Sequence, residues 1–155
     1  MTILDALEAD HDQAKSLLKR ILEAKGAKER GAMFAEFKKM MTAHSRAEEK
    51  VLYKRLEQTE AGKDEALEGA VEHQVADRLM AELARARSKN SDPWTARCKV
   101  LKELIEHHVE EEEDEFFKTA RDEFDPSTLS KMAEEFAREK RKYGVESSGQ
   151  PVAAE

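Results

Sequence analysis

The sequence predicts an all-α protein: an up-down antiparallel four-helix bundle with a short fifth C-terminal helix and a disordered tail. Only six Gly and three Pro occur in 155 residues, so the chain has few turns. Charged and hydrophobic residues each make up 39% of the chain, which is typical of helices with charged outer faces and a narrow apolar seam. A β-sandwich or barrel needs more turns and more β-branched residues, so the composition argues against those folds.

Helical spacing of apolar residues recurs in five successive segments. The expected helices span about residues 2–25, 28–60, 63–89, 91–124 and 125–143. The fourth opens at Ser91, which suits a helix cap, followed closely by Pro93, which suits the first turn. Asp125 and Pro126 open the fifth in the same way, and Gly144 ends it. Because the connections are short, neighbouring helices should run antiparallel.

The other boundaries depend on glycine. Gly26 and Gly62 should end the first two helices, while Gly31 weakens the start of the second by ~1 kcal/mol. The final letters VESSGQPVAAE show no periodicity. We therefore expect one domain over residues 1–143 and a disordered tail over residues 144–155.

Composition also excludes several classes of function. No apolar run approaches the ~20 residues that span a bilayer, so we expect no membrane partner. The first residues carry acids where a signal peptide carries Lys or Arg, and the single Cys98 excludes an internal disulfide, so a cytoplasmic location is expected. The net charge of −7 opposes binding to nucleic acid.

Polar residues interrupt the apolar seam of each of the first four helices at one level, over one or two positions. Four of the five histidines lie there, and two of them are followed by a glutamate one turn later, on the same helix face. The six inward residues are His11, His44, Glu48, His73, His108 and Glu112. At ~1.5 Å rise per residue, these positions reach similar heights along the bundle.

A metal explains this layer better than a satisfied polar core. Ionised carboxylates are almost never left unpaired in a core, and no seam Lys or Arg is available to pair with these. Four imidazoles, two bridging carboxylates and a bridging oxygen nearly fill the roughly twelve positions of two six-coordinate ions. The open positions favour iron that binds or activates a small molecule over a closed structural zinc site.

Three residues have alternative interpretations. His107 replaces His108 if the inward register is Leu104, His107 and Glu111. Asp77, one turn after His73, is a third carboxylate ligand, a partner of a histidine, or a polar group near water. Tyr53 is not placed by the seam.

The same residues resemble the hemerythrin-like, HHE cation-binding domain family. The motifs are DALEADHDQAKSLL, FKKMMTAHSRAEEKVLYKRL, VEHQVADRLMAEL and LIEHHVEEEEDEFF, between about Ile3 and Phe117. The resemblance implies a four-helix bundle that holds a non-haem centre of two Fe ions, oxo- or hydroxo-bridged. By position, the four seam histidines match its terminal ligands, and Glu48 and Glu112 match its bridging carboxylates.

The chain departs from the oxygen-carrying hemerythrins at two positions. Those carriers have a second histidine where Asp77 stands, and a His-x4-Asp arrangement where this chain has His108-x3-Glu112. The resemblance therefore points to a di-iron protein that binds or reacts with O₂, nitric oxide or peroxide, rather than to a reversible oxygen carrier. The alternative is an iron-holding or metal-sensing interaction module without catalysis, whose protein partner the sequence does not indicate.

Overall fold

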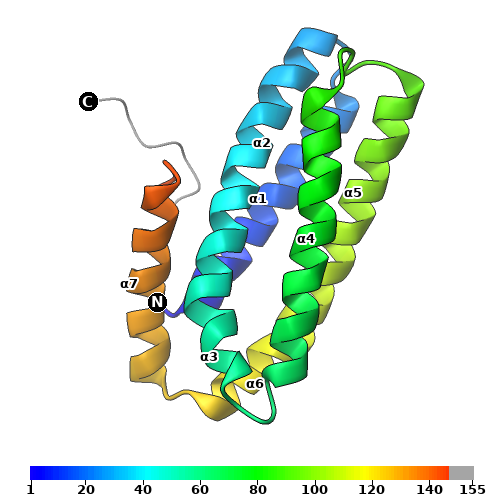
Figure 1. Cartoon of the computed structure of the whole chain (residues 1–155). Helices are drawn as coiled ribbons and strands as arrows, with labels where there is room; N and C mark the ends of the chain where they lie inside the picture. The colour runs from blue at the N-terminus through cyan, green and yellow to red at the C-terminus, as the bar shows by residue number, and fades with distance from the viewer. Residues whose placement is uncertain (147–155) are drawn as a thin grey trace.

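The computed structural model describes residues 1–146, and these residues form the predicted all-α bundle (Figure 1). The elements are α1 (Ile3–Glu23), α2 (Ala27–Glu48), η1 (Glu49–Tyr53), α3 (Lys54–Glu57), α4 (Lys63–Arg85), α5 (Asp92–Glu111), η2 (Glu112–Phe116), α6 (Phe117–Glu123) and α7 (Pro126–Lys142). The elements η1 and η2 are π-helical turns that continue the α-helices on either side of them. The described chain therefore forms four long helices and the shorter α7.

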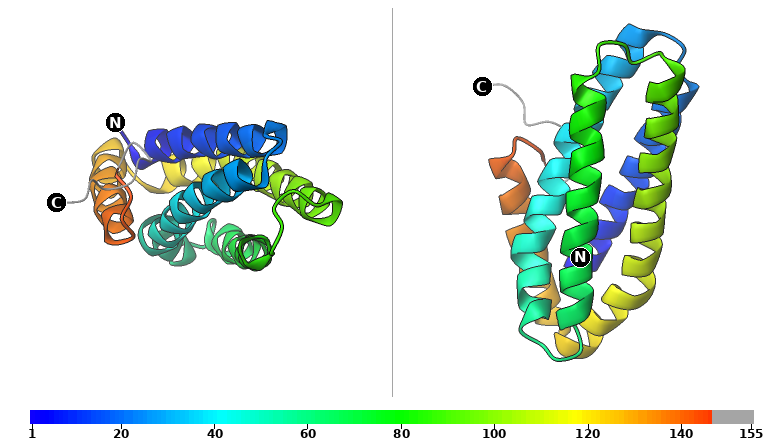
Figure 2. Two further views of the ribbon diagram at one scale, coloured as in Figure 1. Left: turned by 90° about the horizontal axis from the view of Figure 1, so that it is seen from above. Right: turned by 45° about the vertical axis from the view of Figure 1, so that its right-hand side comes forward.

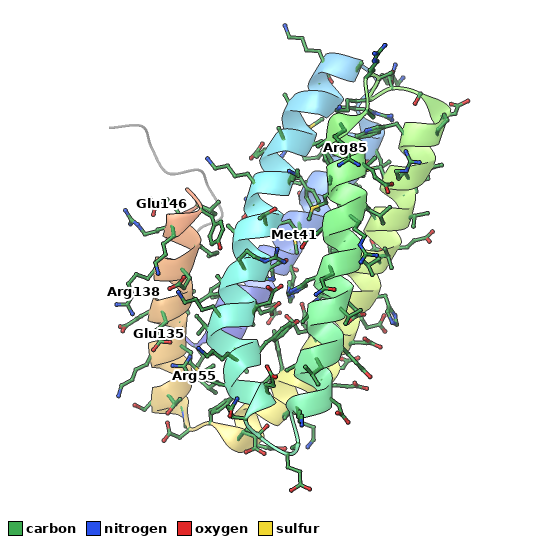
Figure 3. The ribbon with its side chains drawn as sticks, in the orientation of Figure 1. Met41, Arg55, Arg85, Glu135, Arg138 and Glu146 are labelled. Carbon is green, nitrogen blue, oxygen red and sulfur yellow. The ribbon has the colours of Figure 1, made fainter. Side chains whose placement is uncertain are left out.

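The four long helices alternate in direction around a common core. Helix α1 packs against α2 and α5, and α4 packs against the same two helices, which closes the bundle. Figure 2 shows α7 outside this bundle, beside α1 and α2. Arg55 of α3 and Glu135 of α7, both labelled in Figure 3, form a salt bridge with 2.8 Å between Nη2 and Oε2. The predicted antiparallel bundle with a short C-terminal helix is confirmed.

Helix starts follow the capping residues in the sequence. Ser91 Oγ accepts a hydrogen bond from the backbone N–H of Trp94, and Asp125 accepts one from the N–H of Thr128. At the end of α7, Gly144 has a φ of 77°, a left-handed conformation that glycine adopts without strain. The N–H of Val145 then bonds the carbonyl of Lys140, which satisfies a terminal carbonyl of the helix.

Helix α4 ends at Arg85, before the expected residue 89, and α1 and α3 also end slightly earlier than expected. Side chains take the place of the missing turn of α4. The indole N–H of Trp94 donates to the carbonyl of Leu83 at 3.0 Å, and Lys89 Nζ donates to that of Ala84 at 3.0 Å. These bonds satisfy terminal carbonyls that a continued helix would otherwise use.

Two apolar clusters fill the bundle, one toward each end. One contains Leu7, Leu52 and Phe116, and the other contains Leu18 and Trp94. Along α1 the first cluster precedes His11 and the second follows it, so a polar layer separates them. Within residues 1–146, no helix has both the length and the apolar character that a bilayer span requires.

The predicted tail is described only in its first residues. Val145 is buried, so the chain stays packed just past α7. Residues 147–155 lie outside the described residues.

Candidate metal centre

All six inward residues predicted from the seam lie in one buried layer. They come from α1, α2, α4 and α5 and from the first position of η2. Their donor atoms form two groups, each with its atoms within 4.8 Å of one another. The first group is His11, His44, Glu48 and Glu112, and the second is Glu48, His73 and His108.

The two glutamates connect the two groups. Glu48 Oε1 lies 3.7 Å from His44 Nε2 and 3.1 Å from His73 Nε2. Glu112 Oε1 lies 3.2 Å from His11 Nε2, and its Oε2 lies 3.2 Å from His108 Nε2. Each carboxylate therefore faces one histidine of each group, which is the arrangement that a bridging ligand between two cations requires.

Most of the unsatisfied buried polar atoms belong to this layer. Among the described residues, eight buried side-chain nitrogen or oxygen atoms lack a hydrogen-bond partner, and six of them belong to the predicted ligands. These six are His11 Nε2, His44 Nε2, His73 Nε2, Glu48 Oε1, Glu48 Oε2 and Glu112 Oε1. Because buried polar groups normally find partners, such a concentration indicates a set of donors for cations.

Each of the four histidines also contacts a carboxylate through its other ring nitrogen. The Nδ1 pairs are His11–Glu113 at 2.8 Å, His44–Asp10 at 2.9 Å, His73–Glu49 at 2.6 Å and His108–Glu72 at 2.9 Å. A carboxylate that accepts from Nδ1–H leaves Nε2 free to bind a metal and holds the ring in orientation. The donor set thus fits metal binding.

These four acids are not among the residues predicted from the helical seam, although the chain contains a signal for them. Asp10 and Glu72 each immediately precede a seam histidine, and Glu49 and Glu113 each immediately follow a shared glutamate. The pattern acid-His, followed by His-x-x-x-Glu-Glu on the next helix, therefore occurs twice. Each acid contacts a histidine of a neighbouring helix rather than the one beside it in sequence.

Tyr53, which the seam did not place, contacts the site. Its hydroxyl donates to Glu112 Oε2 at 2.5 Å, and its ring stacks on His73 with 5.3 Å between centroids. Phe117 takes the corresponding place on the other side and stacks on His11 at 6.4 Å. Both follow a shared glutamate by five residues across a π-helical turn. The wider turn rotates them inward, whereas an ideal α-helix would place them off the seam.

Gly69 of α4 makes room for Tyr53. A Cβ atom at Gly69 would lie 2.6 Å from the Tyr53 hydroxyl oxygen. We expect Gly69→Ala to destabilise the protein by about 1–3 kcal/mol through overpacking, despite the better helix propensity of Ala. The matched control is Gly31→Ala in α2, where the nearest atom would be Lys89 Cγ at 3.7 Å; it should stabilise by about 1 kcal/mol. Urea unfolding measures both, and a stabilising Gly69→Ala would contradict the Tyr53 placement.

The structure distinguishes between the alternatives that the sequence left open. His107 is 64% exposed and pairs with Glu111 on the surface, while His108 lies with the other predicted ligands. Asp77 belongs to neither group of donors, because its Oδ2 lies 2.9 Å from Arg46 Nη2. Arg46 also binds Glu49, so Asp77 reaches the Nδ1 partner of a histidine through an arginine.

Helix α7 adds a buried cation. Lys140 Nζ lies 3.0 Å from both carboxylate oxygens of Asp10, which contacts His44 Nδ1. Burial opposes the ionised form of Asp10, but the contacts with His44 and Lys140 outweigh it and hold the pKa of Asp10 below its usual value. Phe136 of α7 packs edge-on against His44 with 5.7 Å between centroids. The outer helix is thus in contact with the candidate centre.

The buried charges shift the pKa values within the layer. Burial opposes the charged form of His11, but contacts with Glu112 and Glu113 outweigh it and raise the pKa of His11 to about 9. Burial and the charge of Glu112 raise the pKa of Glu48 well above its usual range. Burial acts on Glu112 too, yet Glu48 and two histidines lower its pKa well below the usual value. These shifts favour the protonated forms of His11 and Glu48, whereas burial lowers the pKa of His44 below its usual value.

Comparison with known proteins agrees with this geometry. The family model described as the hemerythrin HHE cation binding domain matches residues 2–120. The chain is also 27% identical over 154 residues to a protein named DNA nickase from Nostoc sp. (strain PCC 7120 / SAG 25.82 / UTEX 2576). That match covers 99% of this chain but only 43% of the Nostoc protein. No solved structure matches the chain. Because the family model covers most of the chain, including all six donors, the chain belongs to the hemerythrin family of HHE cation-binding domains.

Proposed function

We propose that the chain is a non-haem di-iron protein that binds or reacts with O₂, nitric oxide or peroxide. One iron position is formed by His11 and His44, the other by His73 and His108, and both share the two glutamates. The observation that carries this proposal is the set of six buried donor atoms without hydrogen-bond partners. Two adjacent donor groups that share Glu48 support a pair of ions rather than one.

The donor set favours iron. Imidazole and carboxylate donors suit iron, and a closed structural zinc site would instead be a single tetrahedral group. The pairing of Asp77 with Arg46 removes a carboxylate from the count of ligands, which leaves room beside His73. When bound, an iron pair supplies redox chemistry and open positions for a small ligand.

The protein's own groups then position and shield the centre. Tyr53 donates a hydrogen bond to Glu112 and so holds that carboxylate in place. Phe116, Phe117 and Phe136 belong to the apolar cluster beside the layer and keep water away from it. Cys98 is free and buried, and burial raises the pKa of its thiol to about 11, which keeps it unreactive in the cytoplasm that we predict for the chain.

We propose no role on nucleic acid. The longer Nostoc relative is named for nicking DNA, but this chain spans less than half of that protein. Its net charge of −7 opposes contact with a phosphate backbone. Binding to duplex DNA in a mobility-shift assay at low salt would contradict this part of the proposal.

A second candidate function is metal sensing through α7. Lys140 and Phe136 connect α7 to His44, and both lie beyond the residues 2–120 that the family model matches. In this alternative, metal binding changes how firmly α7 packs, and a partner protein recognises the change. Amide hydrogen exchange of α7, with and without iron, tests it: protection that does not change with metal excludes the sensing role.

The metal content of two adjacent histidine variants tests the ligand assignment. We expect two irons per chain in protein purified from an iron-supplied culture, and loss of at least one in His108→Ala. His107→Ala is the matched control, since His107 is exposed and belongs to the surface pair with Glu111. It should retain full occupancy. Two metals in both variants would contradict the assignment of His108.

Absorption spectra of the reduced protein, before and after exposure to O₂, distinguish the candidate functions. New charge-transfer bands that disappear when O₂ is removed favour reversible binding. Irreversible oxidation of the iron favours reactive chemistry, and an unchanged spectrum with tightly held metal favours the iron-holding module.

A further inference from the structure

A cavity of about 110 Å³ lies between α2, α4 and α5 and reaches the candidate centre. Its wall includes His73 and His108, the two histidines of one proposed iron position. The rest of the wall is mainly apolar, although it also includes Ser45 and Glu72; the apolar residues are Met41, Val71, Val75, Ala76, Leu104 and Ile105. Met41, labelled in Figure 3, projects from α2 toward α4. A water molecule occupies roughly 30 Å³ of liquid, so a diatomic molecule fits inside.

The mouth of this cavity is apolar as well. Val71, Val75 and Leu104 line the cavity and are 56%, 38% and 36% exposed. Single exposed apolar residues need no explanation, but these three lie together around one opening between α4 and α5. Water forms few hydrogen bonds with such a surface. A molecule of low polarity gives up few hydrogen bonds when it leaves water and enters the cavity.

The opposite side of the centre is covered. His11 and His44 are fully buried, beneath the rings of Phe117 and Phe136 respectively. Lys140 and Asp10 close the side that faces α7. The two iron positions therefore differ in how a small molecule can approach them, although their donor sets are closely related.

The position one turn after His73 explains why this side offers room. Asp77 occupies that position, but its carboxylate pairs with Arg46 instead of the donor groups. The neighbouring Ala76, with its small side chain, lines the cavity. No bulky or ligating side chain from this turn closes the space beside His73 and His108.

We propose that this cavity is the entry path and docking pocket for a small uncharged molecule, of the class of dioxygen or nitric oxide, which reaches the centre from the His73 and His108 side. The inference rests on the proposed function and narrows its range of ligands. Anions are disfavoured because the carboxylate of Glu72 lies in the wall, and peroxide is disfavoured because a mainly apolar wall replaces few of the hydrogen bonds that peroxide makes with water.

Xenon tests the cavity without any activity measurement. Crystals of the metal-free and the iron-loaded protein, pressurised with xenon gas, should show xenon between α4 and α5 next to Ala76. Ala76→Phe should abolish this site, because the added ring fills the space. Xenon found only beside His11 or His44, or nowhere near the centre, would overturn the proposal.

Stopped-flow binding of nitric oxide to the reduced iron-loaded protein tests the path. Ala76→Phe should slow binding about tenfold or more, and Val75→Ala at the mouth should leave it equal or faster. Ala84→Phe adds the same ring at an exposed position of α4 and is the matched control. A normal rate in Ala76→Phe with two irons bound would overturn the proposal.

A second variant distinguishes a blocked entry path from a folding defect. Leu104→Trp blocks the mouth from the partly exposed surface and places no new bulk in the core. It should slow nitric oxide binding as Ala76→Phe does. If the proposed function is wrong, the wild-type protein will contain no iron. The xenon experiment on the metal-free protein still decides whether the cavity accepts an apolar gas.

Discussion

Replacing Glu48 with Gln should remove both metal ions while leaving the metal-free fold at least as stable. Glu48 belongs to both donor groups, so the loss of its charge weakens two positions at once. We expect fewer than one iron per chain by elemental analysis. His44→Ala, which removes a donor from one group, should retain the ion at His73 and His108.

The stability of the metal-free Glu48→Gln protein separates this result from unfolding. Without metal, burial and the charge of Glu112 raise the pKa of Glu48 well above its usual range, so folding carries the cost of desolvating Glu48 or of adding a proton to it. A neutral isosteric amide relieves part of that cost. The melting temperature of metal-free Glu48→Gln should therefore equal or exceed that of metal-free wild type, while iron should raise the melting temperature of wild type alone.

Glu115→Gln is the matched control, because Glu115 is exposed in the same acidic run as Glu112. It should change neither the metal content nor the melting temperature. Full iron occupancy in Glu48→Gln would show that Glu48 is not a shared ligand. A metal-free Glu48→Gln that melts well below the metal-free wild type would show that the carboxylate has a structural role of its own.

Replacing Lys140 with Met should destabilise the protein by about 3–5 kcal/mol, the usual cost of removing one partner of a buried ion pair. Lys140 is 1% exposed and contacts both carboxylate oxygens of Asp10, which is also buried. The free energy of unfolding in urea measures the loss. Lys142→Met, at the exposed end of the same helix, should leave it nearly unchanged.

Metal affinity should fall in the same variant. Asp10 orients His44 through Nδ1. Mutating the outer partner of a metal-binding histidine typically lowers the affinity for the metal by roughly 10- to 100-fold. Asp10→Asn combined with Lys140→Met should be less destabilised than Lys140→Met alone, because the unpaired charge is gone. If Lys140→Met leaves both stability and affinity unchanged, α7 is not coupled to the centre, and the metal-sensing function loses its support.

Helical periodicity was sufficient to find the six inward donors. A residue's angle around a helix follows from its position in sequence, so the spacing of His44 and Glu48, or of His108 and Glu112, places each pair on one face. The same reasoning favoured His108 over His107, and the structure places His108 with the other donors. The helix starts at Ser91 and Asp125 were likewise predictable from the sequence, because a helix cap depends on neighbouring residues in the chain.

Contacts between helices could not be predicted from the periodicity of the sequence. Periodicity says which face a residue occupies, but not which neighbouring helix it meets. Asp10 stands next to His11 in the sequence yet contacts His44 on α2, and Asp77 turns to Arg46 instead of joining the donors. Lys140 is buried against Asp10 at a distance in sequence that no local pattern signals.

The sequence by itself therefore determined the bundle, the polar layer and its six donors, because each depends on local spacing and on the cost of burying polar groups. Only the tertiary structure decided the place of Tyr53, the partners of the four histidines and the open side of the layer. The π-helical turn η1 ends at Tyr53 and changes the rotation of this residue around the helix, which brings its hydroxyl to Glu112. The cavity beside His73 exists because side chains of three helices leave space that no single helix encodes.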